Sequence, residues 1–303
     1  MTSTRKETRS KSDIRFDRIN FIILTLIFLI VAYPLYFIII SSFSDPKAVS
    51  SGKVLFAPIG FSLDGYQEVF KNSEVLRGFL NSLFITFIGT CVNLFVTIPT
   101  SYALSRDEFG GRKFVTTFYM ITMFVSGGMI PTYLVVKQLG MLDSVWALVV
   151  PGALSVYNMI VARTFFKSNI PDELLEAAKL DGCSNIRFFF KIALPLSGAI
   201  IAILVLYYGI GHWNAYFSAL LYIQSSEKFP LQLVLRSILV QNTAQLSQGS
   251  VPAAQKEELE RIRQTMELMK YSLIIISSVP VMILYPLVQR HFVKGVMIGS
   301  VKG

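Results

Sequence analysis

Residues 171–195 of the chain read PDELLEAAKLDGCSNIRFFFKIALP. A proline suits the first position of a helix, and Asp172 and Glu173 complement the positive end of the helix dipole. Gly182 suits a left-handed helix stop, and Ser184 can cap a second helix. The stretch therefore predicts a helical hairpin with a compact Ala-Ala face. It is either an amphipathic connector at a membrane surface or a docking site for another protein, and these features alone leave both interpretations open.

The hairpin belongs to a chain whose apolar residues gather in long runs without charge. Of its 303 residues, 53% are hydrophobic and 16% are charged, which excludes disorder as the main state and disfavours a soluble enzyme. A bilayer core needs roughly 20 apolar helical residues. Six runs contain no Asp, Glu, Lys or Arg, and we expect each to span the membrane: 21–40, 82–104, 114–136, 145–162, 196–223 and 271–288.

The basic residues indicate how these spans are oriented, because Lys and Arg gather in cytoplasmic loops. With the N-terminal segment inside, the inner segments 1–20, 105–113, 163–195 and 289–303 hold 17 basic and 9 acidic residues, whereas the outer segments hold 11 and 10. We therefore expect an all-α integral membrane protein of the cell (plasma or inner) membrane with both termini cytoplasmic. Residues 163–195 would form a cytoplasmic loop and residues 224–270 an outside loop. This one-sided charge also removes most of the case for a nucleic-acid partner.

The hairpin follows a specific residue pattern. Glu176-Ala177-Ala178 is followed by three residues, Gly182, nine residues and then Ile192-Ala-Leu194-Pro195. This spacing resembles the EAA signature of ABC-importer permeases at every specified position. The resemblance implies the type I ABC-importer permease fold with six transmembrane helices, and it implies that the hairpin is a coupling helix that docks into a separate ATPase. The residues expected to couple are Glu176, Ala177, Ala178, Asp181, Gly182, Leu194 and Pro195; an aspartate directly before the glycine is a common variant of sugar-type permeases.

Other segments resemble the carbohydrate class of the same family, and the resemblance runs from about residue 66 to the end. Trp213-Asn214-Ala-Tyr216 is similar to a W-N-x-[FY] patch of sugar permeases, and residues 235–242 are similar to a subgroup that imports complex plant or algal oligosaccharides. The tail over 292–303 resembles the C-terminal signature of the maltose-type second membrane subunit. In that family the tail can reach between the ATP-binding subunits, which implies ATPase contacts for Lys294, Gly295, Gly299 and Lys302.

The resemblance also implies a set of partners. They are a second permease subunit that is a different chain, two ATP-binding subunits, an extracytoplasmic solute-binding protein and an oligosaccharide substrate. ATP and Mg²⁺ would be bound by the partner ATPase, and no cofactor by this chain. The sequence itself agrees, because it has no G-x-x-x-x-G-K-[ST] phosphate loop and contains two histidines, so we expect no catalytic residue and no metal site.

Aromatic and polar residues within the spans are candidates for contact with a sugar. Aromatic faces and polar groups that are costly to bury unpaired bind sugars. The candidates for a substrate path are Tyr157, Asn158, His212, Trp213, Asn214 and Tyr216. Contacts between helices, or an aromatic belt at the membrane interface, explain the same residue types, so both interpretations stay open.

Two alternative functions are compatible with the same features. One is an ABC permease for a different solute, such as a polyamine or a phosphonate. The other is a membrane scaffold that recruits a cytoplasmic partner through the hairpin without transport. A proton- or sodium-coupled transporter is disfavoured, because the spans contain no carboxylates.

Overall fold

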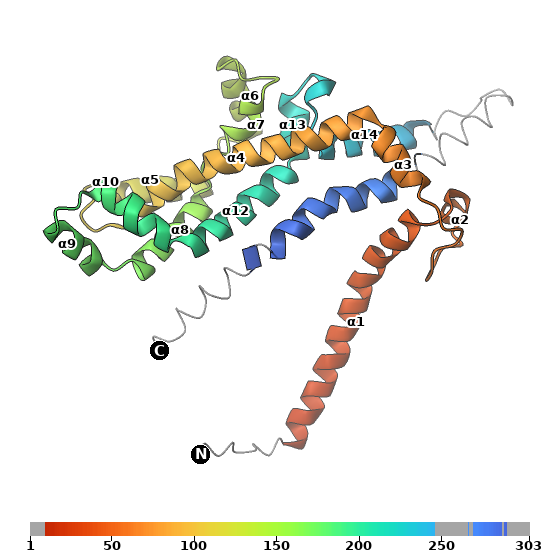
Figure 1. Cartoon of the computed structure of the whole chain (residues 1–303), viewed down its shortest axis with the longest axis horizontal. Coiled ribbons are helices and arrows are strands. Elements are labelled where there is room, and N and C mark those ends of the chain that lie inside the picture. Colours follow the sequence, from red (N-terminus) through yellow and green to blue (C-terminus); the bar gives the residue numbers. More distant parts are fainter. Residues whose placement is uncertain (1–9, 246–265, 267–268, 287, 290–303) are drawn as a thin grey trace. The chain divides into compact units, whose positions relative to one another are not determined.

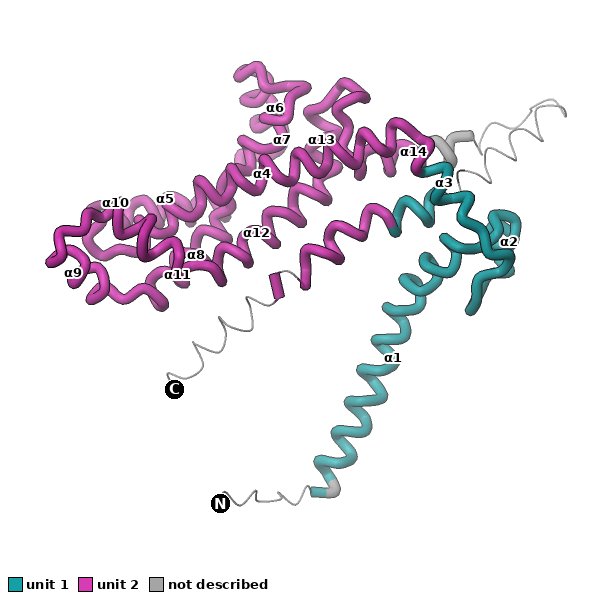
Figure 2. Tube along the Cα trace, in the orientation of Figure 1, with its two compact units in different colours: residues 1–69, 246–275 teal, residues 70–245, 276–303 magenta. Residues whose placement is uncertain are grey.

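The structure is a computed structural model that describes residues 10–245, 266, 269–286 and 288–289 (Figure 1). Every regular element among these residues is a helix, which confirms the expected all-α class for this part of the chain. The residues fall into two compact units, one drawn from residues 1–69 and 246–275 and the other from residues 70–245 and 276–303 (Figure 2).

The first unit is dominated by α1 (Lys11–Ser42), which contains the predicted span 21–40. A capping box starts the helix, since Asp13 accepts from the backbone N–H of Ser10 (3.1 Å) and Ser10 Oγ accepts from that of Ser12 (3.3 Å). After α1 the chain forms α2 (Pro46–Ser50). Ala48 of α2, Ile40 of α1 and Val54 form one buried hydrophobic cluster. The short α3 (Asp64–Lys71) follows.

The second unit is organised around the long helix α4 (Ser73–Ser105), which contains the predicted span 82–104. Helix α4 packs against α5, α7, α8, α12 and α14. The further elements of this unit are α5 (Arg112–Phe124), α6 (Met129–Gln138), α7 (Val145–Val149), α8 (Val156–Asn169), α9 (Asp172–Leu180), α10 (Asn185–Phe188), the π-helix η1 (Phe189–Ala193), α11 (Leu194–Leu196), α12 (Gly198–Trp213), α13 (Tyr216–Tyr222), the 3₁₀ turn η2 (Ser226–Lys228) and α14 (Leu231–Gln245).

One face of α4 carries a small or polar residue at every fourth position. The set is Gly89, Asn93, Thr97, Ser101 and Ser105, and all five are buried. Asn93 Nδ2 donates to the Gly152 carbonyl (2.6 Å), and Ser101 Oγ donates to that of Met159 (3.1 Å). Thr97 shares a 2.8 Å hydrogen bond with the hydroxyl of Tyr208 on α12. Residues four apart lie on one side of a helix, so this stripe bonds the elements that pack against it.

Three predicted spans are not continuous helices. In 114–136, α5 and α6 meet at 115°, where Gly128 has φ +86°. In 145–162, residues 150–155, which include Pro151, separate α7 from α8. In 196–223, the helical stretch 185–196 meets α12 at 77°, and α13 is a separate helix. The absence of charged residues in a run indicates that it is hydrophobic, but it does not indicate where the helix is interrupted.

The described residues contain three helices long and apolar enough to cross a bilayer, at Ser12–Ser42, Ser73–Ser105 and Met269–Pro286. The number rises to five if each bent pair counts as one span, the pairs being α5 with α6 and the stretch 185–196 with α12. The last of the three helices coincides with most of the predicted span 271–288. The pair α7 and α8 stands in the region of the remaining predicted span, 145–162.

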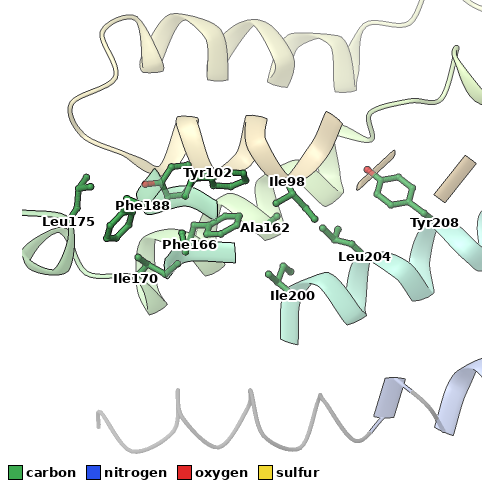
Figure 3. Close-up of a cluster of buried hydrophobic side chains, with 12 residues drawn as sticks. Ile98, Tyr102, Ala162, Phe166, Ile170, Leu175, Phe188, Ile200, Leu204 and Tyr208 are labelled. Atoms are coloured by element: carbon green, nitrogen blue, oxygen red, sulfur yellow. The ribbon is translucent and has the colours of Figure 1, made fainter. Parts of the chain in front are cut away.

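The hydrophobic core of the second unit lies where the predicted hairpin meets the long helices (Figure 3). Tyr102 of α4 places its ring 5.5 Å from that of Phe166 and 4.9 Å from that of Phe189. Leu175 of α9 and Phe188 of α10 are buried in the same cluster. One side of the hairpin is therefore packed into the core of this unit.

Asp143 joins two segments that the sequence predicts to lie on the outer side of the membrane. Its carboxylate accepts from the backbone N–H groups of Gln224 (3.0 Å) and Ser225 (2.9 Å), and it pairs with Lys228 Nζ at 2.7 Å. The Lys228 ammonium, followed by the Ser225 donors, holds the pKa of the Asp143 carboxyl well below its ordinary value. Asp143 itself has φ +55°, a conformation uncommon for a non-glycine residue. The hydrogen bonds to its carboxylate hold this turn in place.

We expect Gly89→Ala to lower the thermal stability of the purified chain in detergent. A Cβ at position 89 would lie 2.5 Å from Nε2 of His212, so the ring must shift and its bond to Asn93 must lengthen. Overpacking of this kind costs about 1–3 kcal/mol. The matched control is Gly211→Ala on α12, where a Cβ has no neighbour within 4 Å. Equal melting temperatures for the two variants would contradict the close approach.

Asp143→Asn should speed hydrogen exchange of the Gln224 and Ser225 amides at neutral pH, because the amide side chain cannot pair with Lys228. A lowered folded-state pKa means that the stabilisation is complete above the ordinary aspartate pKa, and is lost only as pH falls through the folded value. The wild-type protection attributable to Asp143 should thus be constant from pH 8 down to about pH 5. Loss of that protection on acidification within this range would contradict the assignment.

Candidate coupling site and substrate path

The turn of the hairpin has the geometry that its sequence predicts. Gly182 has φ +74°, the left-handed conformation expected for a helix stop. The Cys183 N–H donates to the carbonyl of Ala178 (2.9 Å), and the Gly182 N–H donates to that of Lys179 (2.9 Å). These two bonds form a Schellman motif at the end of α9. Ser184 caps α10 as predicted, with Oγ accepting from the Arg187 N–H (3.3 Å).

Helix α9 presents different residues to the protein and to the outside. Leu175 is buried and Ala178 is half-buried against the core. Glu176, Ala177 and Leu180 are exposed, and Leu180 retains 90% of its accessible surface. The expected Ala-Ala face is therefore divided, because a helix turns about 100° per residue and adjacent alanines point to different sides. The outward face is a mixed acidic and apolar surface.

The end of the signature lies in a tightly turned segment. After α10 the backbone continues through the π-helix Phe189–Ala193 and α11, where Leu194 is half-buried and Pro195 is exposed. Ser197 then ends this stretch, and its buried Oγ donates to the Ala193 carbonyl (2.6 Å). The predicted span 196–223 starts directly after Pro195, but a 77° bend follows Leu196 and α12 begins at Gly198.

A charged residue that the sequence analysis did not single out lies behind the hairpin. Arg106, the residue directly after α4, is only 6% exposed. It pairs with Asp172 at 3.0 Å and donates to the carbonyls of Phe166 (2.9 Å) and Ile170 (3.0 Å). The available signal was its position: it directly follows Ser105, the last residue of the polar stripe of α4, and is the second residue of the short inner loop 105–113.

The candidate substrate-path residues are distributed over buried and exposed positions. Trp213 is 3% exposed; its indole N–H donates to the Ser277 carbonyl (2.9 Å), and its ring packs edge-on against Phe79. Asn158 is also buried, and His212 is half-buried with Nε2 2.6 Å from Oδ1 of Asn93.

Three members of the set have accessible side chains. They are Tyr157 at the start of α8, Asn214 directly after α12 and Tyr216 at the start of α13. The six residues therefore do not form one surface. Trp213 and Asn158 have the burial of packing residues, whereas the three exposed ones can meet a solute.

The predicted ATPase contacts in the tail, Lys294, Gly295, Gly299 and Lys302, lie outside the described residues. The geometry of the hairpin confirms the left-handed stop and the second cap. The coupling role of Glu176, Ala177, Ala178, Asp181, Gly182, Leu194 and Pro195 stays a prediction.

Comparison with known proteins gives the chain a family. No protein-family model matches it. It is 40% identical over 294 residues to the polygalacturonan/rhamnogalacturonan transport system permease protein YtcP of Bacillus subtilis, covering 95% of this chain and 98% of the relative. It is 41% identical over 293 residues to the protein LplC of the same organism, covering 95% of each.

A solved structure agrees with these relatives. A chain of a bacterial ABC transporter involved in the import of the acidic polysaccharide alginate superimposes with a TM-score of 0.85 and 30% identity, covering 95% of this chain and all of that one. The chain belongs to the permease subunits of carbohydrate ABC transport systems, a family of membrane-embedded proteins.

Proposed function

We propose that this chain is the membrane-spanning permease subunit of a binding-protein-dependent ABC importer that moves an oligosaccharide inward. The observation that carries the proposal is the outward face of α9, which ends in a Schellman stop at Gly182 and is backed by a buried core. A short helix that exposes acidic and apolar side chains, among them Glu176 and Leu180, suits insertion into a groove of another protein. Membership in the ABC-transport permease family supports the choice of an ATP-binding subunit as that protein.

The direction and topology of the proposal rest on charge. The inner segments hold 17 basic and 9 acidic residues, which favours a cytoplasmic hairpin and cytoplasmic termini. Six spans result when the three long helices are counted with the two bent pairs and with α7 plus α8.

In this arrangement ATP closes the partner subunits, the hairpin moves with them, and the spans reorient to receive sugar from the binding protein. Hydrolysis by the partner resets the inward-facing state.

The substrate class follows from the relatives. One relative's name gives polygalacturonan and rhamnogalacturonan as the cargo, and the solved neighbour imports alginate, an acidic polysaccharide. We therefore extend the proposal to an oligosaccharide that contains uronic acids. Tyr157, Asn214 and Tyr216 are the path residues that we expect to contact it, because their side chains are accessible and an aromatic face can stack on a sugar ring.

Gly182→Asp should remove the ATPase from the complex while the second permease stays bound. A side chain in the left-handed conformation costs roughly 1–2 kcal/mol and distorts the stop that shapes α9. The matched control, Asn185→Asp, adds the same charge three residues later on an exposed site and should keep the ATPase. The measurement is co-purification of the tagged chain from native membranes, with identification of its partners. Absence of any ATPase beside the wild-type chain would favour the scaffold function instead.

Tyr157→Ala and Tyr216→Ala should each raise the half-saturating concentration for uptake of a labelled oligogalacturonide by the assembled transporter. Loss of one stacking contact corresponds to roughly a three- to tenfold effect. Leu220→Ala on the same helix as Tyr216, also exposed, is the control and should leave uptake unchanged. Unchanged half-saturation in both tyrosine variants would exclude them from the path.

A further inference from the structure

We propose that the loop directly after α4 is part of the coupling machinery, with Arg106 as the positioning residue that fixes α9 to α4. The inference rests on the proposed function of α9 as the coupling helix. It adds the route by which a displacement of α9 enters the membrane-embedded part of the protein.

Arg106 joins three helices through one buried guanidinium. Its Nη2 donates to the carbonyls of Phe166 and Ile170 at the end of α8, and the Phe166 carbonyl also accepts from the Ile170 N–H (3.1 Å). Its Nε donates to Ser105 Oγ (3.0 Å), and the guanidinium carbon lies 5.4 Å from the centre of the Tyr102 ring. A buried cation is tolerated only when it is paired and its donors are satisfied, so these contacts hold the group in one position.

The remaining donor of Arg106 points to the first residue of α9. Nη1 lies 3.0 Å from Oδ1 of Asp172, and the Asp172 side chain is half-exposed. The cation thus sits at the negative end of α8 while its carboxylate partner sits at the positive end of α9, which is the favourable placement for both helix dipoles. The start of α9 is held to the cytoplasmic end of α4 and to the end of α8 at the same point.

The far end of α9 is held to the same loop. Lys179 forms an ion pair with Glu108, two residues after Arg106. This second pair is more exposed, so it contributes less than the buried one. The second pair fixes the orientation of α9, because Asp172 and Lys179 are seven residues apart and lie on one side of the helix. Two points fixed on one helix prevent it from pivoting about either of them.

Helix α4, which ends at this loop, bonds to other helices of the second unit. Asn93 bonds to His212 of α12 and to the Gly152 carbonyl, and Ser82 accepts from the Leu231 N–H of α14 (2.8 Å). A displacement of α9 therefore moves α4, and α4 carries it to α12 and α14. In this proposal the bending point lies outside α9, the loop and α4, and we place it at the 77° bend at Ser197 between the hairpin segment and α12.

The first test replaces the charge of Asp172 and keeps its size. In proteoliposomes that contain the full complex with its binding protein, Asp172→Asn should reduce uptake of a labelled oligogalacturonide by roughly tenfold, the loss expected for one charged hydrogen bond. The ATPase should remain bound, and the ATP hydrolysed per sugar moved should rise. Asp172→Glu should recover part of the uptake, and Glu173→Gln, the adjacent acidic residue, is the matched control. Unchanged uptake in Asp172→Asn, or loss of the ATPase from it, would overturn the assignment.

The second test fixes the far end of α9 covalently. In a Cys91→Ala, Cys183→Ala background, Glu108→Cys and Lys179→Cys are linked by a short bifunctional methanethiosulfonate reagent, with a monofunctional reagent as control. If α9 and the loop move as one body, the link should leave uptake within about twofold of the control. Loss of uptake on linking, restored by reductant, would show that α9 moves relative to the loop.

A wild-type complex that takes up no oligogalacturonide would refute the proposed substrate. A failure of these variants alone would refute only the proposed attachment of α9 to the loop after α4.

Discussion

A chain that crosses a bilayer must satisfy its backbone polar groups within the protein, because the lipid core offers no hydrogen bonds. This chain breaks its helices at several places and must therefore supply partners at each break. The polar stripe of α4 does so for the break between α7 and α8, where Asn93 reaches the Gly152 carbonyl and Tyr208, held by Thr97, accepts from the Ser155 N–H. Arg106 completes the stripe at the end of α8. The packing of the second unit depends on this one helix face.

Two kinds of sequence signal predict parts of this fold: hydrophobic runs and local turn residues. Hydrophobic runs locate α1, α4 and the last long helix, because burial in lipid is a property of composition. Local turn chemistry locates the stop at Gly182 and the cap at Ser184, because both depend on a single residue type in a fixed conformation. The Gly127-Gly128 pair could have indicated the bend between α5 and α6, since a left-handed residue is expected there.

Other features depend on tertiary contacts that no local pattern contains. Trp213 was a candidate for sugar contact, but its burial and its bond to Ser277 are set by a residue 64 positions away. Arg106 was counted among the basic residues of an inner loop, and its partners on α8 and α9 become visible only in the folded unit. The alternation of Ala177 and Ala178 between outside and core likewise follows from where α9 docks.

The proposals divide the second unit into a part that would move as one body and segments that would bend. A stiff body formed by α9, the loop after α4 and α4 itself would receive the motion of the ATPase. The bends at Ser197 and at residues 125–128 would allow the remaining segments to change their angle to that body. Polar pairs inside the unit would keep the helices in register during such a change, since each pair is costly to break in a low dielectric.

The central claim is that ATP hydrolysed by a partner drives sugar through this subunit. Its most direct test is uptake of a labelled oligogalacturonide into proteoliposomes that hold the natively purified complex, with ATP supplied on the side of the hairpin and the binding protein on the other. The account predicts accumulation against the sugar gradient that requires ATP and the binding protein together. Uptake that proceeds without ATP, or no uptake by a complex that contains both permeases and the ATPase, would contradict it.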